Sequence, residues 1–255
     1  MPDFTLLNNF FEHVYVISLQ RHTDRQEKMK EVLEGLNYSF FRGMDKKNLT
    51  IDLLVEKGIY NEEKAKELHR YDKPMNTGQI GRAWTHRLVY EDIVLSGYKK
   101  VLILEDNVVL NNAGFLLLEN MIEQLPADWE LWYLDYHNNL RRDVGSFFVQ
   151  TSMHFRRLIG KLKLTPTAID NFFARKFSEN LFRAGYHDLT TAYALTLPAA
   201  KKLIELQTPV TFCSDNLLAH ACTNLLINGY VSVPKIFLKE TFLIDRKTKE
   251  SYLEE

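Results

Sequence analysis

The sequence is poor in cysteine and has no long apolar run, and each shortage excludes a class of protein. Its two cysteines, Cys213 and Cys222, lie on one predicted helical segment, with a spacing that does not suit a disulfide. We therefore expect a cytoplasmic protein in a reducing compartment. No apolar stretch approaches the roughly 20 residues that span a bilayer. The first residues carry no basic leader, so we expect no signal peptide.

Several recognised catalytic and binding motifs are also missing. The sequence contains no G-x-G-x-x-G and no phosphate-binding loop, which removes support for Rossmann dinucleotide binding and for P-loop nucleotide hydrolysis. Histidine and cysteine do not occur at zinc-binding spacing. There is no G-x-S-x-G nucleophile elbow.

Charge is nearly balanced over the whole chain but not within it. The formal net charge is −1, which argues against nucleic-acid binding as the main function. Segment 136–186, in contrast, has nine basic residues and three acidic ones. The basic residues are Arg141, Arg142, Arg156, Arg157, Lys161, Lys163, Arg175, Lys176 and Arg183. Seven phenylalanines are interleaved with them: Phe147, Phe148, Phe155, Phe172, Phe173, Phe177 and Phe182.

Two interpretations of this segment stay open. Its charge and aromatic residues suit peripheral contact with an anionic membrane or a phosphorylated glycolipid. Alternatively, it is a helical insertion whose phenylalanines pack inward. In either case we expect one domain over residues 1–255 with a basic helical insertion at about 136–186.

Hydrophobic patterning predicts an α/β fold. β-branched and aromatic runs predict strands at 13–19, 38–43, 101–104, 129–135 and 189–197. Helices are predicted after Thr23 with a capping box to Gln26, over 77–97, over 198–207 with Pro198 first, and over 214–230 with Ser214 as cap. Alternating strands and helices indicate a mostly parallel sheet, whose ligands bind beyond the carboxyl ends of the strands.

Polar clusters follow three of the predicted strands, at 21–25, 105–107 and 135–137. Glu105, Asp106 and Asn107 interrupt the apolar stretch VLILEDNVVL. Adjacent carboxylates repel unless a cation lies between them, and Mg²⁺ or Mn²⁺ bound to a diphosphate would be such a cation. The alternative is a solvated turn after an edge strand.

Other candidate residues each have two interpretations. Arg21 and Arg25 could contact a phosphate or a base, or be solvated in a first helical turn, where the dipole disfavours cations. Asp215 could be a general base or a dipole-stabilised acid in a first turn. Asp188 is a second candidate for that base. His86 taken alone is a packing or surface histidine.

Four blocks of the sequence, taken in order, resemble glycosyltransferase family 25, which includes bacterial lipopolysaccharide and collagen galactosyltransferases. They are VYVISLQRHTDRQEKM, GQIGRAWTHRLVYEDIVLSG, LILEDNVVL and LTTAYALTLPAAKKLIE. The matching positions are Arg21, Arg25, Gly78, Ile80, Gly81, His86, Glu105, Asp106, Thr191, Ala192, Tyr193 and Ala200.

The resemblance implies a GT-A fold with a Rossmann-like mixed sheet flanked by helices. It also implies inverting transfer of a hexose, most often from UDP-galactose, to a glycan such as lipopolysaccharide or lipooligosaccharide, usually with Mn²⁺. Donor-binding candidates are then Arg21, Arg25, Gly78, His86, Glu105 and Asp106. Metal-binding candidates are Glu105, Asp106 and Asn107. Asp215 is the first candidate for general base and Asp188 the second, on position only.

Three residues depart from the family pattern. Gln79 stands where glutamate is usual, Thr85 replaces a common serine, and Asn107 replaces the last aspartate of E-D-D. An amide oxygen can coordinate a metal but brings no charge. A catalytically impaired relative that binds a nucleotide sugar or a glycan is therefore the alternative to an active transferase.

Overall fold

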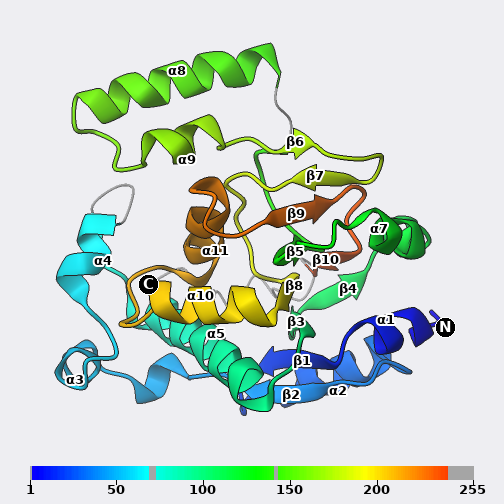
Figure 1. Ribbon diagram of the computed structural model, residues 1–255. Helices are drawn as coiled ribbons and strands as arrows, with labels where there is room; N and C mark the ends of the chain where they lie inside the picture. Colours follow the sequence, from blue (N-terminus) through cyan, green and yellow to red (C-terminus); the bar gives the residue numbers. More distant parts are fainter. Residues whose placement is uncertain (1, 69–72, 141–142, 241–255) are drawn as a thin grey trace.

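Strands and helices alternate along much of the chain in the computed structural model, which describes residues 2–68, 73–140 and 143–240 (Figure 1). The strands are β1 (His13–Ser18), β2 (Ser39–Arg42), β3 (Lys100–Glu105), β4 (Val108–Leu110), β5 (Leu131–Tyr133), β6 (Arg175–Lys176), β7 (Leu181–Arg183), β8 (Ala192–Thr196), β9 (Gly229–Ser232) and β10 (Phe237–Lys239). The helices are α1 (Thr5–Phe10), α2 (Thr23–Val32), α3 (Ile51–Glu56), α4 (Glu62–Leu68), α5 (Thr77–Ser96), α6 (Asn112–Phe115), α7 (Leu118–Gln124), α8 (Val144–Leu158), α9 (Pro166–Asp170), α10 (Leu197–Leu206) and α11 (Ser214–Thr223), with a 3-10 turn η1 (Lys46–Asn48). Within the described ranges, every helix is too short or too polar to cross a membrane.

One mixed sheet of 8 strands organises the molecule, in the order β2-β1-β3-β8-β5-β9-β7-β6. β1 is parallel to β2 and β3, and β5 is parallel to β9. The remaining neighbours are antiparallel, because β8 runs against both β3 and β5, and β7 against both β9 and β6. β4 and β10 form a separate antiparallel pair. The predicted α/β class with a mixed sheet is confirmed. The expectation of a mostly parallel sheet is wrong, because four of the seven pairings between neighbouring strands are antiparallel.

Alternate residues of each central strand point to opposite faces of the sheet, and both faces are covered. Val101 and Ile103 of β3 belong to a core shared with α5, α10 and α11. Leu102 and Leu104 belong to the opposite core, with α1, α2 and α7. This double coverage is why VLIL reads as a continuous apolar run instead of an alternating one.

Two of the three predicted polar clusters, 21–25 and 105–107, meet at one edge of the sheet. β1, β2 and β3 are parallel, so their carboxyl ends lie together. β8 is antiparallel to β3, which brings its amino end, from Thr190 onward, to the same edge. The backbone amide of Asp106 bonds to Ile17 O, and that of Glu105 to Thr191 O (3.1 and 2.9 Å).

Some predicted helix boundaries were wrong. Helix α2 begins at Thr23, but its cap position is His22 and no side chain caps it, so the Thr23–Gln26 capping box is absent. Gln26 instead donates to Ser18 Oγ and Leu19 O. Helix α11 ends at Thr223, well before residue 230, and its cap position is Cys213, not Ser214. Helix α10 begins one residue early, with Pro198 in its first turn.

Segment 136–186 is helical only in its first part. α8 and α9 come first, and then β6 and β7 extend the main sheet beyond β9. Its phenylalanines differ in burial. Phe172 is buried and Phe173 packs beside it, whereas Phe147, Phe148 and Phe155 are exposed. Arg141 and Arg142 lie outside the described residues.

Candidate functional site

Asp106 is the centre of a polar network at the carboxyl edge of β1 and β3. Its carboxylate accepts hydrogen bonds from Ser18 Oγ (2.8 Å) and from Arg25 Nη1 (3.2 Å), and it lies 3.3 Å from His22 Nδ1. The side chain is almost completely buried. Ser18 ends β1, and the other two donors belong to the turn and first helical turn behind it. The pairing of Arg25 with a buried carboxylate explains why a cation occupies the start of α2.

Glu105 belongs to a second network, directed towards α5. Arg82 forms an ion pair with its carboxylate, and the Thr190 hydroxyl donates to the same oxygen (2.8 Å). Arg82 also donates to Thr190 Oγ1 (3.0 Å). Burial raises the pKa of Glu105, but Arg82 and His86 outweigh it and hold the pKa well below its usual value. The carboxylate is therefore ionised and already neutralised by a protein cation.

His86 connects Glu105 to the interior of the protein. Its Nε2 lies 3.7 Å from Glu105, and its Nδ1 is 2.6 Å from the Tyr193 hydroxyl, which is 3.0 Å from that of Tyr90. Burial lowers the pKa of His86, against the opposing effect of Glu105. A neutral histidine in a chain of buried hydroxyls fits a positioning role for the end of β3 better than direct contact with a ligand.

Asn107 is the third residue of the triplet and differs from the other two. Its Oδ1 is buried without a hydrogen-bond partner among the described residues, whereas its backbone carbonyl accepts from the Glu240 amide (2.7 Å). A buried oxygen left without a donor is costly, and a cation or an amide donor would satisfy it. Of the three predicted metal ligands, Asn107 is thus the one with a buried oxygen that lacks a hydrogen-bond partner among the described residues.

The predicted metal site offers few charged protein ligands. Over the described ranges, no group of three or more His, Cys, Asp and Glu side chains converges to hold an ion. Glu105 pairs with Arg82 and Asp106 with Arg25, and Asn107 follows Asp106 directly in the turn after β3. An Mg²⁺ or Mn²⁺ ion that keeps one carboxylate and gains its other ligands from phosphate and water would fit Asp106 and Asn107.

A hollow of about 500 Å³ opens beside the Asp106 network, at the ends of β1 and β2. It is lined by Gln20, Arg21, Arg42, Gly43, Met44, Asp45, Asn48 and Leu49. Arg21 Nε donates to Asp45 Oδ2 (2.6 Å). Burial raises the pKa of Asp45, but hydrogen bonds from the Lys47 backbone and from Arg21 leave it below its usual value. The volume of the hollow is within the common range for small-molecule pockets.

Helix α5 holds the wall of this hollow in place. Asn76 and Gln79 form a capping box, each side chain accepting from the other residue's backbone amide (2.9 and 3.0 Å). A Cβ on Gly81 would come within 3.0 Å of Met44 O, so glycine allows the close approach. Thr85 Oγ1 accepts from the Met44 amide (2.8 Å). Gly78 is buried in the first turn. Gln79 and Thr85 therefore both have structural explanations.

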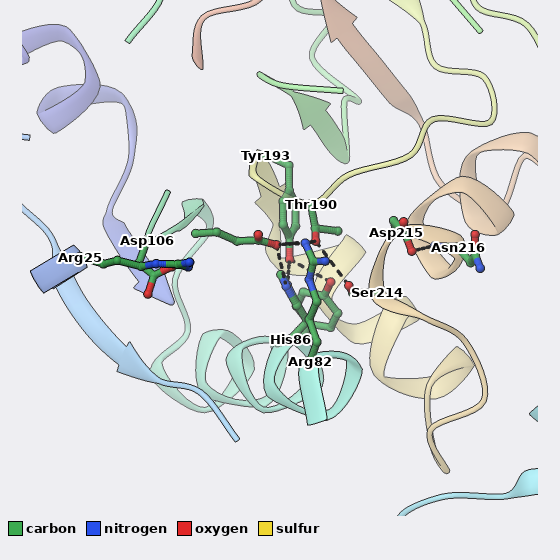
Figure 2. Close-up of polar contacts among 11 residues, drawn as sticks. Arg25, Arg82, His86, Asp106, Thr190, Tyr193, Ser214, Asp215 and Asn216 are labelled. Carbon is green, nitrogen blue, oxygen red and sulfur yellow. Dashed lines mark hydrogen bonds and ion pairs between the residues drawn. The ribbon is translucent and has the colours of Figure 1, made fainter. Parts of the chain in front are cut away.

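Asp215, the first candidate base, lies on the other side of the Glu105 network from Asp106 (Figure 2). Asp215 is half-buried in the first turn of α11, where its Oδ1 accepts from the Asn216 amide (2.9 Å). Figure 2 shows Arg82 and His86 between Asp106 and Asp215. Burial lowers the pKa of Arg82, and the charges of Glu105 and Asp215 raise it above its usual value.

Asp188 lies farther along, in the segment that leads into β8. Its backbone pairs with His137 in both directions (2.9 and 3.1 Å), and its Oδ2 accepts from Asn138 Nδ2 (2.9 Å). The third predicted polar cluster, 135–137, thus meets Asp188 and not the triplet 105–107. Asp135 at its start is buried and pairs with Lys235 (3.0 Å).

Sequence reasoning missed Ser18, His22, Arg82 and Thr190. Arg82 lies four residues before His86, so helical spacing places both on one face of α5, and that signal was present. His22 lies within the predicted cluster 21–25, and Ser18 lies three residues before that cluster. Thr190 could not be found from the sequence, because only the antiparallel pairing of β8 with β3 brings it to Glu105.

The chain is similar to known glycosyltransferases in sequence. The family model described as glycosyltransferase family 25 (LPS biosynthesis protein) matches residues 11–218. A glycosyltransferase 25 family member from Aedes aegypti is 27% identical over 198 residues, or 76% of this chain and 28% of that protein. The human inactive glycosyltransferase 25 family member 3 is 26% identical over 210 residues, covering 77% of this chain and 29% of that protein.

The name of a third relative states which sugar that protein transfers. Human procollagen galactosyltransferase 2 is 24% identical over 199 residues, or 76% of this chain and 27% of that protein. The chain therefore spans less than a third of the length of these curated relatives.

Solved structures give weaker similarity. A glycosyltransferase involved in glycosylation of the major capsid of PBCV-1 aligns over 90% of this chain and 92% of its own, with 11% identity and a TM-score of 0.40. Galactosyltransferase LgtC aligns over 82% of this chain and 70% of its own, with 10% identity and a TM-score of 0.35. Because both TM-scores are below 0.5, the fold assignment rests on the sheet and helices of this structure and not on these two similarities.

Proposed function

This chain belongs to glycosyltransferase family 25, and from that premise we propose that it transfers a hexose from a nucleotide sugar to a glycan hydroxyl. The donor in the proposal is UDP-galactose, in keeping with the name of the procollagen galactosyltransferase relative. The acceptor is a lipopolysaccharide or lipooligosaccharide sugar, in keeping with the family's description. Transfer inverts the configuration at the anomeric carbon.

The observation that carries the proposal is the edge of the sheet at which the Asp106 network adjoins the hollow beside Arg21. Arginine makes paired hydrogen bonds to phosphate and stacks on rings. In the proposal the nucleoside occupies the hollow, and the diphosphate lies towards Arg25 and the turn 105–107. Parallel strands in α/β sheets commonly bind ligands at this edge.

Asp106 and Asn107 would hold Mn²⁺ or Mg²⁺ in this proposal, and the ion would supply positive charge to the leaving diphosphate. Asn107 is suited to it by its unpartnered oxygen. Glu105 serves a different purpose, because Arg82 already neutralises it. We propose that Glu105 and His86 fix the end of β3 so that the turn 105–107 keeps its shape.

Inversion needs a carboxylate that takes the proton of the acceptor hydroxyl. As that proton leaves, the hydroxyl oxygen forms a bond to the anomeric carbon, and the bond from this carbon to the diphosphate oxygen breaks, releasing UDP. Asp215 is our first candidate, since it is half-buried beside the Arg82 network. Asp188 is the second, because it lies two residues before Thr190, at the same edge of the sheet.

The experiment incubates the protein with a panel of nucleotide sugars, glycan acceptors and Mn²⁺, and measures the nucleotide released. We expect UDP-galactose to react, and Asp215→Asn to lower kcat by at least about 100-fold without weakening UDP binding. Asp188→Asn and the exposed-surface control Asp52→Asn should change kcat much less. A large loss of kcat in Asp188→Asn alone would show that Asp188, and not Asp215, is the general base.

A second candidate function is a relative that binds a nucleotide sugar or a glycan without catalysis. Asn107 favours it, because the position lacks the charge that a metal-binding aspartate would bring. One of the similar human proteins is named as inactive. The wild-type protein would then bind UDP and release no nucleotide from any donor in the panel.

A further inference from the structure

Helix α8 turns an apolar face towards solvent. Val144, Phe147, Phe148, Phe155, Leu158 and Ile159, the last just past its end, are between 47% and 80% exposed. Val144, Phe148, Phe155 and Ile159 recur at spacings of four or seven residues and so share one stripe. The buried residues of the helix, Ser146, Gln150 and Met153, lie on the opposite side. The polarity of α8 is thus inverted relative to a helix that packs on a core.

The attachment of α8 to the molecule does not use this apolar face. Gln150 Nε2 donates to the carbonyls of Ile169 and Asp170 at the end of α9 (2.7 and 3.0 Å). Figure 1 shows α8 along the outer border of the molecule, beyond α9 and away from the sheet. Three phenylalanines are exposed on one peripheral helix, and the rings of Phe147 and Phe148 contact each other (6.0 Å between centroids), which is a feature of interaction sites.

The charges around this apolar face indicate what it contacts. Arg156 and Arg157 lie in the last turn of α8, and Lys161 follows; all three are exposed. The described part of segment 136–186 carries seven basic residues against three acidic ones, although the whole chain is at −1. An apolar aromatic face with arginine and lysine at its border is typical of a helix that lies in an anionic membrane interface.

We propose that α8 docks on an anionic lipid bilayer. Phe147, Phe148 and Phe155 enter the boundary between headgroups and acyl chains, while Arg156, at the side of this stripe, contacts lipid phosphates. Arg157 is four residues after Met153 and so lies on the attached side of the helix. A second copy of the chain is a poorer occupant, because it would place two segments with the same excess of basic residues against each other. The proposal does not depend on the transferase activity, since lipid binding is measured without donor or acceptor.

Co-sedimentation with vesicles tests it, using phosphatidylcholine with and without phosphatidylglycerol at low and high salt. We expect binding only when phosphatidylglycerol is present, and less of it at high salt. Phe148→Ser/Phe155→Ser should weaken binding at least about tenfold. Arg156→Gln should weaken it about fivefold, and Arg157→Gln, on the attached side of the helix, much less.

The matched control is Leu95→Ser/Leu116→Ser, which removes two leucines that are 86% and 84% exposed on other elements. This variant should bind like wild type, and circular dichroism should show all variants folded. Absence of wild-type binding to phosphatidylglycerol vesicles overturns the proposal, as does an equal loss in the control. A wild-type dimer that Phe148→Ser/Phe155→Ser dissociates, with no vesicle binding, would identify α8 as a self-association surface instead.

Discussion

At the scale of single residues, Arg82 and Glu105 form the ion pair on which the edge of the sheet depends. Removing Arg82 alone leaves a buried carboxylate without its cation. We expect Arg82→Met to lower the free energy of unfolding by about 3–5 kcal/mol. The double variant Arg82→Met/Glu105→Gln should recover much of that loss, because no uncompensated charge remains.

Urea denaturation measures this difference, with Arg87→Met as the control. Arg87 is on the same helix and pairs with Glu91, whose side chain is 40% exposed. Exposed pairs contribute at most about 1 kcal/mol, so this variant should change little. Equal losses in the two single variants would show that Glu105 does not need its partner.

At the residue scale, His187 should make the stability of the protein depend on pH. It is fully buried, its Nε2 accepts from the Gly185 amide (2.9 Å), and its Nδ1 is 2.9 Å from Asn138 O. Burial lowers its pKa from 6.5 to about 4. The folded protein therefore keeps it neutral at a pH where the unfolded chain protonates it.

The stabilising contribution of His187 is complete above pH 6.5 and is lost as the pH falls to about 4. Fully lost, it is worth roughly 3 kcal/mol. Urea midpoints across this range should fall less steeply for His187→Gln than for wild type. His154→Gln, at an exposed histidine on α8, should keep the wild-type slope. Parallel slopes for His187→Gln and wild type would contradict the assignment.

At the scale of elements, the capping box of α5 explains why Gln79 departs from the family pattern. Either glutamine or glutamate can accept from the Asn76 amide at this position. We expect Gln79→Glu to keep or slightly raise the thermal midpoint, since an acid in the first turn suits the helix dipole. Gln79→Ala should destabilise the protein by about 1 kcal/mol.

Released nucleotide is measured for the same variants. If Gln79 only caps the helix, Gln79→Glu has wild-type activity. A large gain of activity in Gln79→Glu, with an unchanged midpoint, would instead give this residue a role in the reaction.

The elements divide into those that local sequence predicts and those that it does not. The apolar runs of β1, β3 and β5 and the long pattern of α5 were recognised, because burial on both faces or on one stripe leaves a strong signature. The cap of α2 was mispredicted, since Gln26 turns back to Ser18 and Leu19. β6 and β7 were missed because each is too short to show a pattern.

At the scale of the whole molecule, segment 136–186 is tied to the rest of the protein by its two strands. β7 pairs with β9, and Ile169 of α9 shares a core with Ala219 of α11. We therefore expect one cooperative transition in differential scanning calorimetry, with a single peak for the full chain. Two resolved peaks would show that the segment folds as a separate unit.

The same scale explains which parts of the candidate site the sequence could reveal. The sequence placed the polar clusters 21–25 and 105–107 after two strands, and the parallel pairing of those strands, β1 and β3, brings Arg25 to Asp106. The contact of Thr190 with Glu105 depends on a reversed strand from the far half of the chain, which no local pattern encodes. The sequence also did not indicate that Glu105 and Asp106 have different partners. These neighbouring residues of one triplet point into different hydrogen-bond networks.

The central claim, that residues 105–107 form the donor site of a family 25 transferase, is tested most directly by nucleotide release from UDP-galactose as Mn²⁺ is titrated. Wild type is compared with Asn107→Asp, and with Asn120→Asp as a surface control. We expect metal-dependent release from wild type and a requirement for roughly tenfold less metal in Asn107→Asp, because a carboxylate brings a charge that the amide lacks. Asn120→Asp should match wild type. No release from wild type or Asn107→Asp at any Mn²⁺ concentration, while UDP still binds, would contradict the claim.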